Sequence, residues 1–490
     1  MNSSSSTSSA AAYETNASGK FTLHVLTGFA LLGLLVTGIW DFAGFTGNER
    51  LFYQLANHGG NYRLFTIISY LFDGKMLSLL TLVFGAGIAV FLNRKEEPGS
   101  LPNADIFIRR QIWLIVLGLV LAFILLWPKD VLYPFGIVGI LLFAFGKLPA
   151  RSLLITALIC MAIYCGKNYW FYADDVSDHK KYVAITVVEK KFKDDSTTRA
   201  KKFIVDKSAD SLTKKKILGQ KKLADSLAKK KDTLTNKQAD EKGKWEGMVA
   251  GFKYDSSKTV KDNTTMRKGY GKIWAYRKGS SQYRESYWLY SFGVWDIASL
   301  MLLGMALLGM GFFNGRYSSG KYFVIALLLL IAGFALTRFR LHSNQIRIAD
   351  YAKYIDNHSI PYNQFLPVEQ LLLAAGYASL IMSVLQLKFL QWLWIALSAV
   401  GKMPVTNYVL QTLIGCFIFY GYGFGYYGRF PQWGLYAMVA EISLVQIVFS
   451  VFWFRYYQTG PLEWLLKNMI YRKWVPLPKQ PPVNDITNAN

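Results

Sequence analysis

The stretch that decides the fold class lies in the second half of the chain. Residues 288–313 read WLYSFGVWDIASLMLLGMALLGMGFF and contain a single charged residue, Asp296. An apolar run of this length, wound as a helix, can cross a hydrocarbon core of about 30 Å. Its apolar residues run on without the strict alternation that a strand of a membrane β-barrel would show. The run therefore predicts a membrane-spanning helix.

Similar runs recur on both sides of this one. We predict ten membrane-spanning helices, and we expect two shorter apolar segments to be interfacial or half-helices. Hydrophobic residues make up 52% of the 490 residues and charged residues only 18%, below the roughly 25% of globular domains. This composition excludes a soluble enzyme, a coiled coil and a disordered chain. The predicted spans are 21–42, 76–92, 111–127, 131–146, 152–171, 288–313, 321–337, 366–385, 404–422 and 432–454, and the short segments are 62–73 and 389–401.

The distribution of basic residues predicts the orientation of these helices. With the N-terminus inside, Lys and Arg number sixteen in the short inner loops and the tails and eight in the short outer loops, leaving aside the long segment 173–287. Because cytoplasmic loops are enriched in Lys and Arg, both termini are expected in the cytoplasm. The N-terminal residues lack the basic region and short apolar region of a cleaved signal. We therefore expect a multi-pass protein of a bacterial inner membrane, with the lipid bilayer as its constant partner.

One long basic segment interrupts the membrane helices. Residues 173–287 hold 29 Lys and Arg against 16 Asp and Glu, so they carry +13 of the net charge of +24. In the predicted orientation this insert is extracytoplasmic. The expected organisation is a disordered Ser-rich tail (1–20), a five-helix membrane bundle (21–172), the basic insert (173–287), a second five-helix membrane domain (288–475) and a tail (476–490).

The insert contains a short repeat, ADSLTKKK at 209–216 and ADSLAKKK at 224–231. Its alternating charges and its leucines at helical spacing are typical of a solvated helical hairpin without chemistry. The alternative is a basic surface that docks anionic glycans, anionic lipid headgroups or a partner protein. Nucleic acid is not expected, because the Lys-rich part has no interleaved aromatic residues and lies outside the cytoplasm in this orientation.

Ionisable residues at the predicted helices are candidates for function, because a charge in a membrane is costly. Asp296 lies about two turns into its predicted helix. Asp130 lies in the tight turn before 131–146, where it either caps that helix or takes a proton from a substrate hydroxyl or amine. His58, in the first outer loop, is either a solvated residue or a general base.

Other polar residues have simpler interpretations. Asp73 and Lys75 are expected to pair with each other or to close a hinge, and Glu369 to stabilise a helix N-terminus. Neither a zinc motif, nor a Walker motif, nor a nucleophile elbow is present. The sequence therefore predicts no metal site and no resident cofactor.

The C-terminal third carries the most specific motif. Residues 401–415 read GKMPVTNYVLQTLIG, and residues 460–465 read GPLEWL. This pattern resembles the C-terminal domain of the YeiB family of bacterial membrane proteins, domain of unknown function 418. Two upstream stretches are similar to the same family, LVFGAG at 82–87 and MLLGMAL at 301–307. The family-motif polar residues are Asn407, Tyr408, Gln411 and Glu463, and helix packing is the alternative role of the first three.

The resemblance implies a function as well. YeiB-type proteins look related to membrane acyltransferases of the heparan-α-glucosaminide N-acetyltransferase type, which pass an acetyl group from cytoplasmic acetyl-CoA to a sugar amine with a loop histidine. By this resemblance the chain is an acyltransferase that uses acyl-CoA as donor and an envelope glycan or lipid as acceptor. His58 would be its base, Asp130 or Asp296 its orienting carboxylate, and Arg109 or Arg110 its group for the donor phosphates.

The first helix departs from the family pattern. His24, Thr27 and Gly38 stand where the family usually has an aspartate, an arginine and an asparagine. The aspartate and the arginine are both absent here. Loss of both is less costly than loss of one, because a single remaining ion would be a buried charge without a partner. The alternative function is therefore a family member without catalysis that acts as a membrane scaffold or partner subunit. A transporter is a third class, which no inverted repeat of interrupted helices supports.

Overall fold

The computed structural model of the chain describes residues 17–45, 52, 59–94, 102–202, 211–231 and 233–480. The candidate base His58 lies outside these residues. Within them the regular elements are helices, and the β-type pairing is an isolated bridge between Tyr457 and Lys479. In this described part of the chain, eight helices or helix pairs are long and apolar enough to cross a membrane, and Leu132–Phe145 and Pro404–Phe419 are shorter apolar helices. The expected all-α polytopic membrane fold is confirmed.

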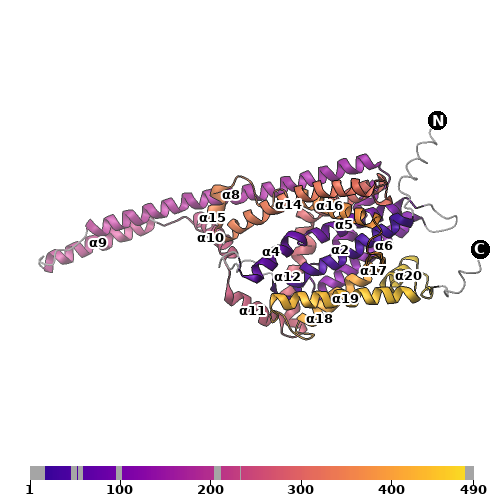
Figure 1. Cartoon of the computed structure of the whole chain (residues 1–490). Coiled ribbons are helices and arrows are strands. Elements are labelled where there is room, and N and C mark those ends of the chain that lie inside the picture. The colour runs from indigo at the N-terminus through magenta and orange to yellow at the C-terminus, as the bar shows by residue number, and fades with distance from the viewer. Residues whose placement is uncertain are drawn as a thin grey trace, which may run out of the picture. The chain divides into compact units, whose positions relative to one another are not determined.

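The predicted spans all overlap helices of the structure. The short segment at 62–73 forms α4, which joins α5 in one apolar stretch, Gly60–Leu92, and the segment at 389–401 forms α17. The helices that carry the fold are α2 (Ala17–Ala43), α4 (Gly60–Leu71), α5 (Lys75–Leu92), α6 (Asn103–Phe123), α7 (Leu132–Leu142), α8 (Ala150–Lys202), α12 (Tyr270–Tyr283), α13 (Val294–Gly309), α14 (Ser319–Ala349), α16 (Leu366–Gln386), α17 (Gln391–Lys402), α18 (Pro404–Phe419), α19 (Gln432–Tyr456) and α20 (Pro461–Tyr471) (Figure 1).

The described residues form two compact units. The first draws on residues 1–167, 255–342 and 362–490, and the second on residues 168–254 and 343–361. Helix α8 runs without interruption to Lys202, well past the end of its apolar stretch at 171, because charged residues are as compatible with a helix as apolar ones. The apolar run marks where the membrane part of the helix ends and not where the helix ends.

The second unit has an aromatic core of its own. Trp245 of α10 (Asn236–Phe252) is only 2% exposed, and its ring lies 4.6 Å from that of His179 and 5.7 Å from that of Tyr351. Nε2 of His179 lies 3.1 Å from the Asp356 carboxylate. Part of the basic insert is thus packed against residues 343–361, which follow the seventh predicted span.

The first unit is a helical bundle held together by close helix crossings. A Cβ atom on Gly85 of α5 would lie 2.1 Å from the Met301 carbonyl oxygen of α13, and one on Gly304 would lie 1.8 Å from the Leu82 carbonyl oxygen. Glycine is needed here because the two backbones touch. The two upstream stretches that resemble the YeiB family, 82–87 and 301–307, therefore pack against each other.

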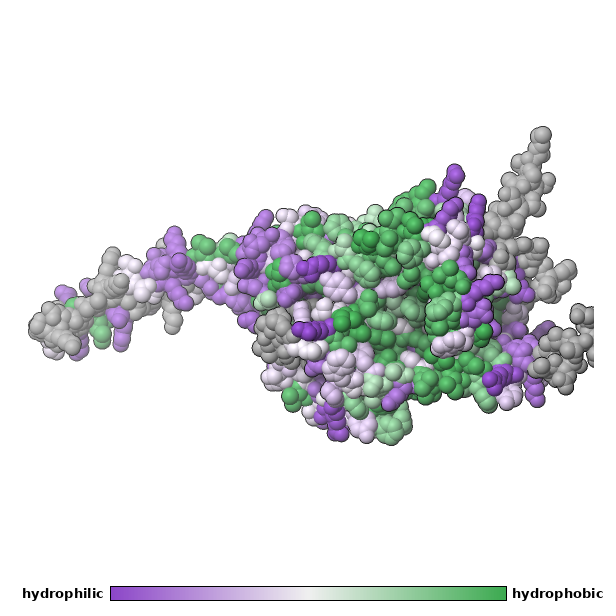
Figure 2. Space-filling view, viewed as in Figure 1, coloured by the Kyte–Doolittle hydropathy of each residue, from purple (hydrophilic) through white to green (hydrophobic). Residues whose placement is uncertain are grey.

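The outer face of the bundle is apolar. Large apolar side chains are exposed on α8, α14 and α19, among them Ile155 (58%), Leu328 (64%) and Leu444 (61%). Figure 2 shows apolar residues gathered over the bundle, with hydrophilic residues toward its ends. Contiguous exposed apolar surface on this scale is characteristic of a membrane-facing protein.

Candidate functional site

Two cavities lie along successive halves of α2. The first, of about 560 Å³, is lined by α2 residues between Lys20 and Leu31, and the second, of about 380 Å³, by α2 residues between Leu34 and Phe42. Two residues, Val131 and Tyr408, line both cavities. The cavities therefore approach the same wall from opposite directions along α2.

The first cavity is basic near the start of α2 and apolar beyond it. Its cationic side chains come from four separate elements and are Lys20, Arg110, Lys402 and Lys467. Deeper along α2 and α6 its walls are leucines such as Leu31 and Leu114. A lining of this kind suits a ligand with a polyanionic head and an apolar tail.

The structure separates the two neighbouring arginines of α6. Arg110 lines the first cavity, and its guanidinium lies 5.9 Å from the ring centres of Phe84 and Phe91. Within the described part of the chain it has no carboxylate at ion-pair distance. Arg109 does not line the cavity, because its guanidinium bonds to Asp105 at 2.8 Å and to the Ile470 carbonyl at 3.3 Å.

The wall between the cavities carries a buried hydroxyl–carboxylate pair. The Tyr408 hydroxyl donates to Asp130 Oδ1 at 3.3 Å and accepts a hydrogen bond from the Val131 N–H at 3.1 Å. Asp130 is fully buried, and its Oδ2 accepts a hydrogen bond from the Tyr133 N–H at 2.7 Å. Asp130 thus accepts a hydrogen bond from the first turn of α7, although the N-cap residue itself is Val131. Burial raises the pKa of Asp130, which lies in the loop between α6 and α7, to about 6.

The other polar residues of the C-terminal motif join helices. The Asn407 amide donates to the Val400 carbonyl at 2.9 Å, and the Gln411 amide donates to Gln446 of α19 at 2.8 Å. Glu463 of α20 accepts hydrogen bonds from the Val405 N–H and from the N–H and hydroxyl of Thr406. Glu463 thus fixes α20 at the N-terminus of α18, and Asn407 and Gln411 make the expected helix-packing contacts.

Asp296 lies apart from this wall. It is in the first turn of α13, it lines neither cavity, and its Oδ1 is buried without a hydrogen-bond partner in the described part of the chain. The structure brings Tyr408 and Arg110 to the lining of one cavity, with Asp130 behind the Tyr408 hydroxyl, and it leaves Asp296 and Arg109 outside the lining.

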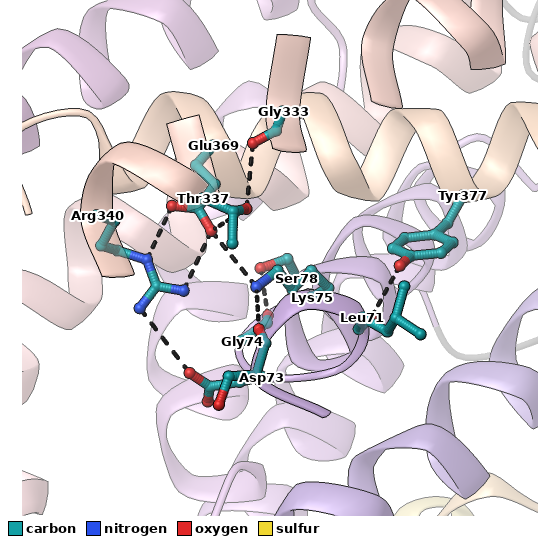
Figure 3. A network of polar contacts seen from close by, with 11 residues as sticks. Leu71, Asp73, Gly74, Lys75, Ser78, Gly333, Thr337, Arg340, Glu369 and Tyr377 are labelled. Carbon is teal, nitrogen blue, oxygen red and sulfur yellow. Dashed lines mark hydrogen bonds and ion pairs between the residues drawn. The ribbon is translucent and has the colours of Figure 1, made fainter. Parts of the chain in front are cut away.

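A second cluster of polar residues lies beside the second cavity (Figure 3). Lys75, only 1% exposed, donates to the Ser69 carbonyl at 2.7 Å and lies 3.5 Å from Glu369. Arg340 binds Glu369 at 2.8 Å and approaches Asp73 at 3.9 Å. Lys75 therefore pairs with Glu369 of α16, and Asp73, on the other side of the left-handed N-cap Gly74, lies close to Arg340 instead.

Sequence reasoning missed several lining residues of the first cavity. In the sequence, Lys20, Lys402 and Lys467 contribute only to the count of basic residues in the inner loops and tails. No sequence signal predicts that these distant positions line one cavity. His24 and Thr27, which depart from the family pattern, also line this cavity. In the described residues no group of three or more His, Cys, Asp and Glu side chains is placed to hold a metal ion.

Comparison with known proteins tests the resemblance to the YeiB family. Residues 307–473 match the family model described as "Protein of unknown function (DUF418)". The chain is 24% identical over 476 residues to the uncharacterized protein YxaH of Bacillus subtilis, covering 94% of this chain and 96% of YxaH. It is 32% identical over 178 residues to the uncharacterized protein YeiB of Escherichia coli, covering 36% of this chain and 45% of YeiB. No solved structure matches the chain. These matches confirm the expected resemblance to the YeiB family, and residues 307–473 carry its DUF418 region.

Proposed function

We propose that this protein is a membrane acyltransferase that passes an acyl group from a donor in the first cavity to an acceptor in the second. The observation that carries the proposal is the shared wall, where Tyr408 lines both cavities and its hydroxyl bonds to the buried carboxylate of Asp130. A donor and an acceptor that approach this wall from opposite sides would meet beside a group able to move a proton.

The first cavity supports an acyl-CoA as donor. The phosphates of such a donor need cations, and Lys20, Arg110, Lys402 and Lys467 supply four near one end. The apolar remainder of the cavity suits the acyl chain and the pantetheine arm. A free arginine is the most informative of these groups, because Arg110 has no competing carboxylate among the described residues.

The proposed reaction is a single displacement. The acceptor oxygen or nitrogen forms a bond to the acyl carbon, and the carbon–sulfur bond of the thioester breaks. The proton of the acceptor passes through the Tyr408 hydroxyl to Asp130 and then to the departing thiolate, so that the products are the acylated acceptor and free thiol. His58, which follows α2 in the sequence and lies outside the described residues, remains a second candidate for the base.

The proposed orientation places the donor in the cytoplasm of a bacterial cell. Lys20, near the N-terminus, and Lys467, near the C-terminus, line the same cavity. This supports an arrangement with both ends of the chain on one side, and the excess of basic residues on that side supports the cytoplasm. The acceptor would then be a glycan or lipid of the cell envelope.

A second candidate function is a membrane scaffold without catalysis. One observation favours it: two of the residues that depart from the family pattern, His24 and Thr27, line the first cavity itself. In that case the cavity would be a remnant, and the second unit, with the basic helix α9 (Ser211–Lys231), would be the working surface for an anionic glycan, lipid or protein.

Photo-crosslinking tests the proposed donor site. Purified protein in phosphatidylcholine nanodiscs is irradiated with a benzophenone-bearing acyl-CoA, and labelled peptides are mapped by mass spectrometry. We expect labels within residues 80–91 and 106–114, which contain lining residues of the first cavity and none of the second, and competition by unmodified acetyl-CoA. Labels confined to the exposed face of α14, or the absence of specific labelling, would favour the scaffold.

A further inference from the structure

Arg284 is an unpaired cation in the wall of the second cavity. Three cationic and two acidic residues line this cavity. Lys129 pairs with Asp41 at 2.7 Å, and Arg340 with Glu369 at 2.8 Å and Asp73 at 3.9 Å. Arg284 has no hydrogen bond or ion pair within the described part of the chain, and its Nε is buried. The lining therefore carries one cation more than its own carboxylates neutralise.

The local backbone holds Arg284 in this position. It is the first residue of a ten-residue π-helix, Arg284–Gly293, between α12 and α13. π-Helical turns are rare and are frequent at functional sites. The guanidinium carbon lies 3.3 Å from the centre of the Trp288 ring, a cation–π contact that holds the guanidinium without using its N–H groups as hydrogen-bond donors.

The carboxylates that influence Arg284 do not satisfy it. Glu285, Asp296 and Asp130 act on its charge from beyond ion-pair distance, and none of the three lines the second cavity. A guanidinium without a close partner is costly in a buried site, and the cost is offset when a ligand supplies the anion. Arginine is suited to this because its planar fork binds carboxylate or phosphate through two parallel hydrogen bonds.

We propose that the second cavity is an oxyanion-binding site, in which Arg284 holds a phosphate or carboxylate group of the molecule that occupies it. The inference rests on the proposed function only in identifying that molecule with the acyl acceptor, which is then an anionic one. Aromatic side chains of the same cavity, among them Trp40, Phe42 and Trp127, would contact the uncharged remainder of the acceptor. Lipid headgroups and soluble glycan phosphates or uronic acids share this chemistry.

The test measures anion binding without any acyl donor. Glycerol 3-phosphate and glucuronate are titrated by calorimetry into protein in phosphatidylcholine nanodiscs. Phosphatidylglycerol is added to such nanodiscs, and its retention is measured by native mass spectrometry. The variants are Arg284→Gln, Arg284→Lys and the control Arg338→Gln, whose side chain is exposed on α14 and lines neither cavity. Melting temperatures establish that each variant is folded.

We expect the wild-type protein to bind at least one of the three probes. The affinity for that probe should be about ten-fold or more weaker in Arg284→Gln, partly restored in Arg284→Lys and unchanged in Arg338→Gln. Binding only of glycerol 3-phosphate or glucuronate identifies a soluble or glycan acceptor, and binding only of phosphatidylglycerol identifies a lipid. Arg110→Ala separates the two cavities, because it should leave this binding intact. Absence of binding by all three probes, or equal binding by wild type and Arg284→Gln, would overturn the inference. Loss of acetyl-CoA binding alone would refute the proposed function and not this site.

Discussion

The hydroxyl of Tyr408 in α18 donates a hydrogen bond across 3.3 Å to the carboxylate of Asp130, 278 residues away in the loop before α7. The same hydroxyl accepts the Val131 N–H at 3.1 Å, so it connects α18 to the start of α7 through two contacts. Tyr408 and Val131 line both cavities, and Asp130 lies behind this shared wall. The contact between Tyr408 and Asp130 therefore links the packing of the bundle to the proposed chemistry.

Removing the hydroxyl should weaken the bundle and stop transfer. Tyr408→Phe leaves the buried Val131 N–H without its acceptor and removes the hydroxyl donor to Asp130 Oδ1, at a cost of about 1–3 kcal/mol. We expect a lower melting temperature in detergent and unchanged acetyl-CoA binding. The control is Tyr377→Phe. This variant also removes a tyrosine hydroxyl, but the hydrogen bond that it loses, to the Leu71 carbonyl, is exposed and not buried. Equal melting temperatures of the two variants would show that the contact at the wall contributes nothing.

The stability of the protein should depend on the ionisation of Asp130. Burial raises its pKa from 3.8 to about 6, so the folded state holds a proton that the unfolded state has lost. Wild type should therefore lose stability as the pH rises from about 4 to about 6, and Asp130→Asn should lack this part of the slope. Thermal unfolding across this range measures the difference. Parallel curves for the two proteins would contradict the assignment.

The rate of acyl transfer should depend on pH in the opposite direction from the stability, because Asp130 is the proposed proton acceptor. Only the ionised carboxylate can take a proton from the acceptor, so the rate of acyl transfer should rise as the pH passes through about 6. A rate that falls over the same interval would exclude Asp130 as the proton acceptor.

The crossing of α5 and α13 should tolerate no side chain. A Cβ on Gly85 would lie 2.1 Å from the Met301 carbonyl oxygen, so Gly85→Ala must push two backbones apart. Overpacking of this kind costs about 1–3 kcal/mol or more. Gly87→Ala, two residues further on, is the matched control, since nothing lies within 4 Å of its Cβ position. Folded yield in detergent should fall for Gly85→Ala alone, and equal yields would refute the close crossing.

The buried carboxylate of Glu369 should contribute strongly to the stability of the fold, because it neutralises two cations. Glu369→Gln leaves Lys75 and Arg340 without the carboxylate that binds both, and breaking a buried pair costs about 3–5 kcal/mol. The double variant Lys75→Met with Glu369→Gln removes one of the two uncompensated charges and should recover part of the loss. Melting temperatures of the single and double variants measure this coupling. If the two effects simply add, Lys75 and Glu369 do not interact.

The membrane helices could be predicted because their signal is local. An apolar run of sufficient length identifies a span wherever it lies, and even the short segments at 62–73 and 389–401 are helices. The extension of α8 to Lys202 carries no such signal, because its charged residues fit a helix and a loop equally well. The core around Trp245 was missed for a related reason, since its partners include residues 343–361.

The candidate site could be predicted only in part. Asp130 was identified because a carboxylate in a tight turn between two apolar runs is unusual, and Tyr408 because it belongs to the family motif. Arg109 and Arg110 could not be told apart, because adjacent residues on a helix differ in facing by about 100° and the sequence does not say which direction is the cavity. Arg284 looked like one of many charges of the insert.

Calorimetric titration of acetyl-CoA into the purified protein tests the central claim most directly. The two neighbouring arginines make a matched pair, because Arg110 lines the first cavity and Arg109 is bound to Asp105 and to the Ile470 carbonyl. The account predicts that wild type and Arg109→Ala bind acetyl-CoA and that Arg110→Ala binds it about ten-fold or more weakly. Failure of the folded wild-type protein to bind acetyl-CoA, or equal affinities of the two variants, would contradict it.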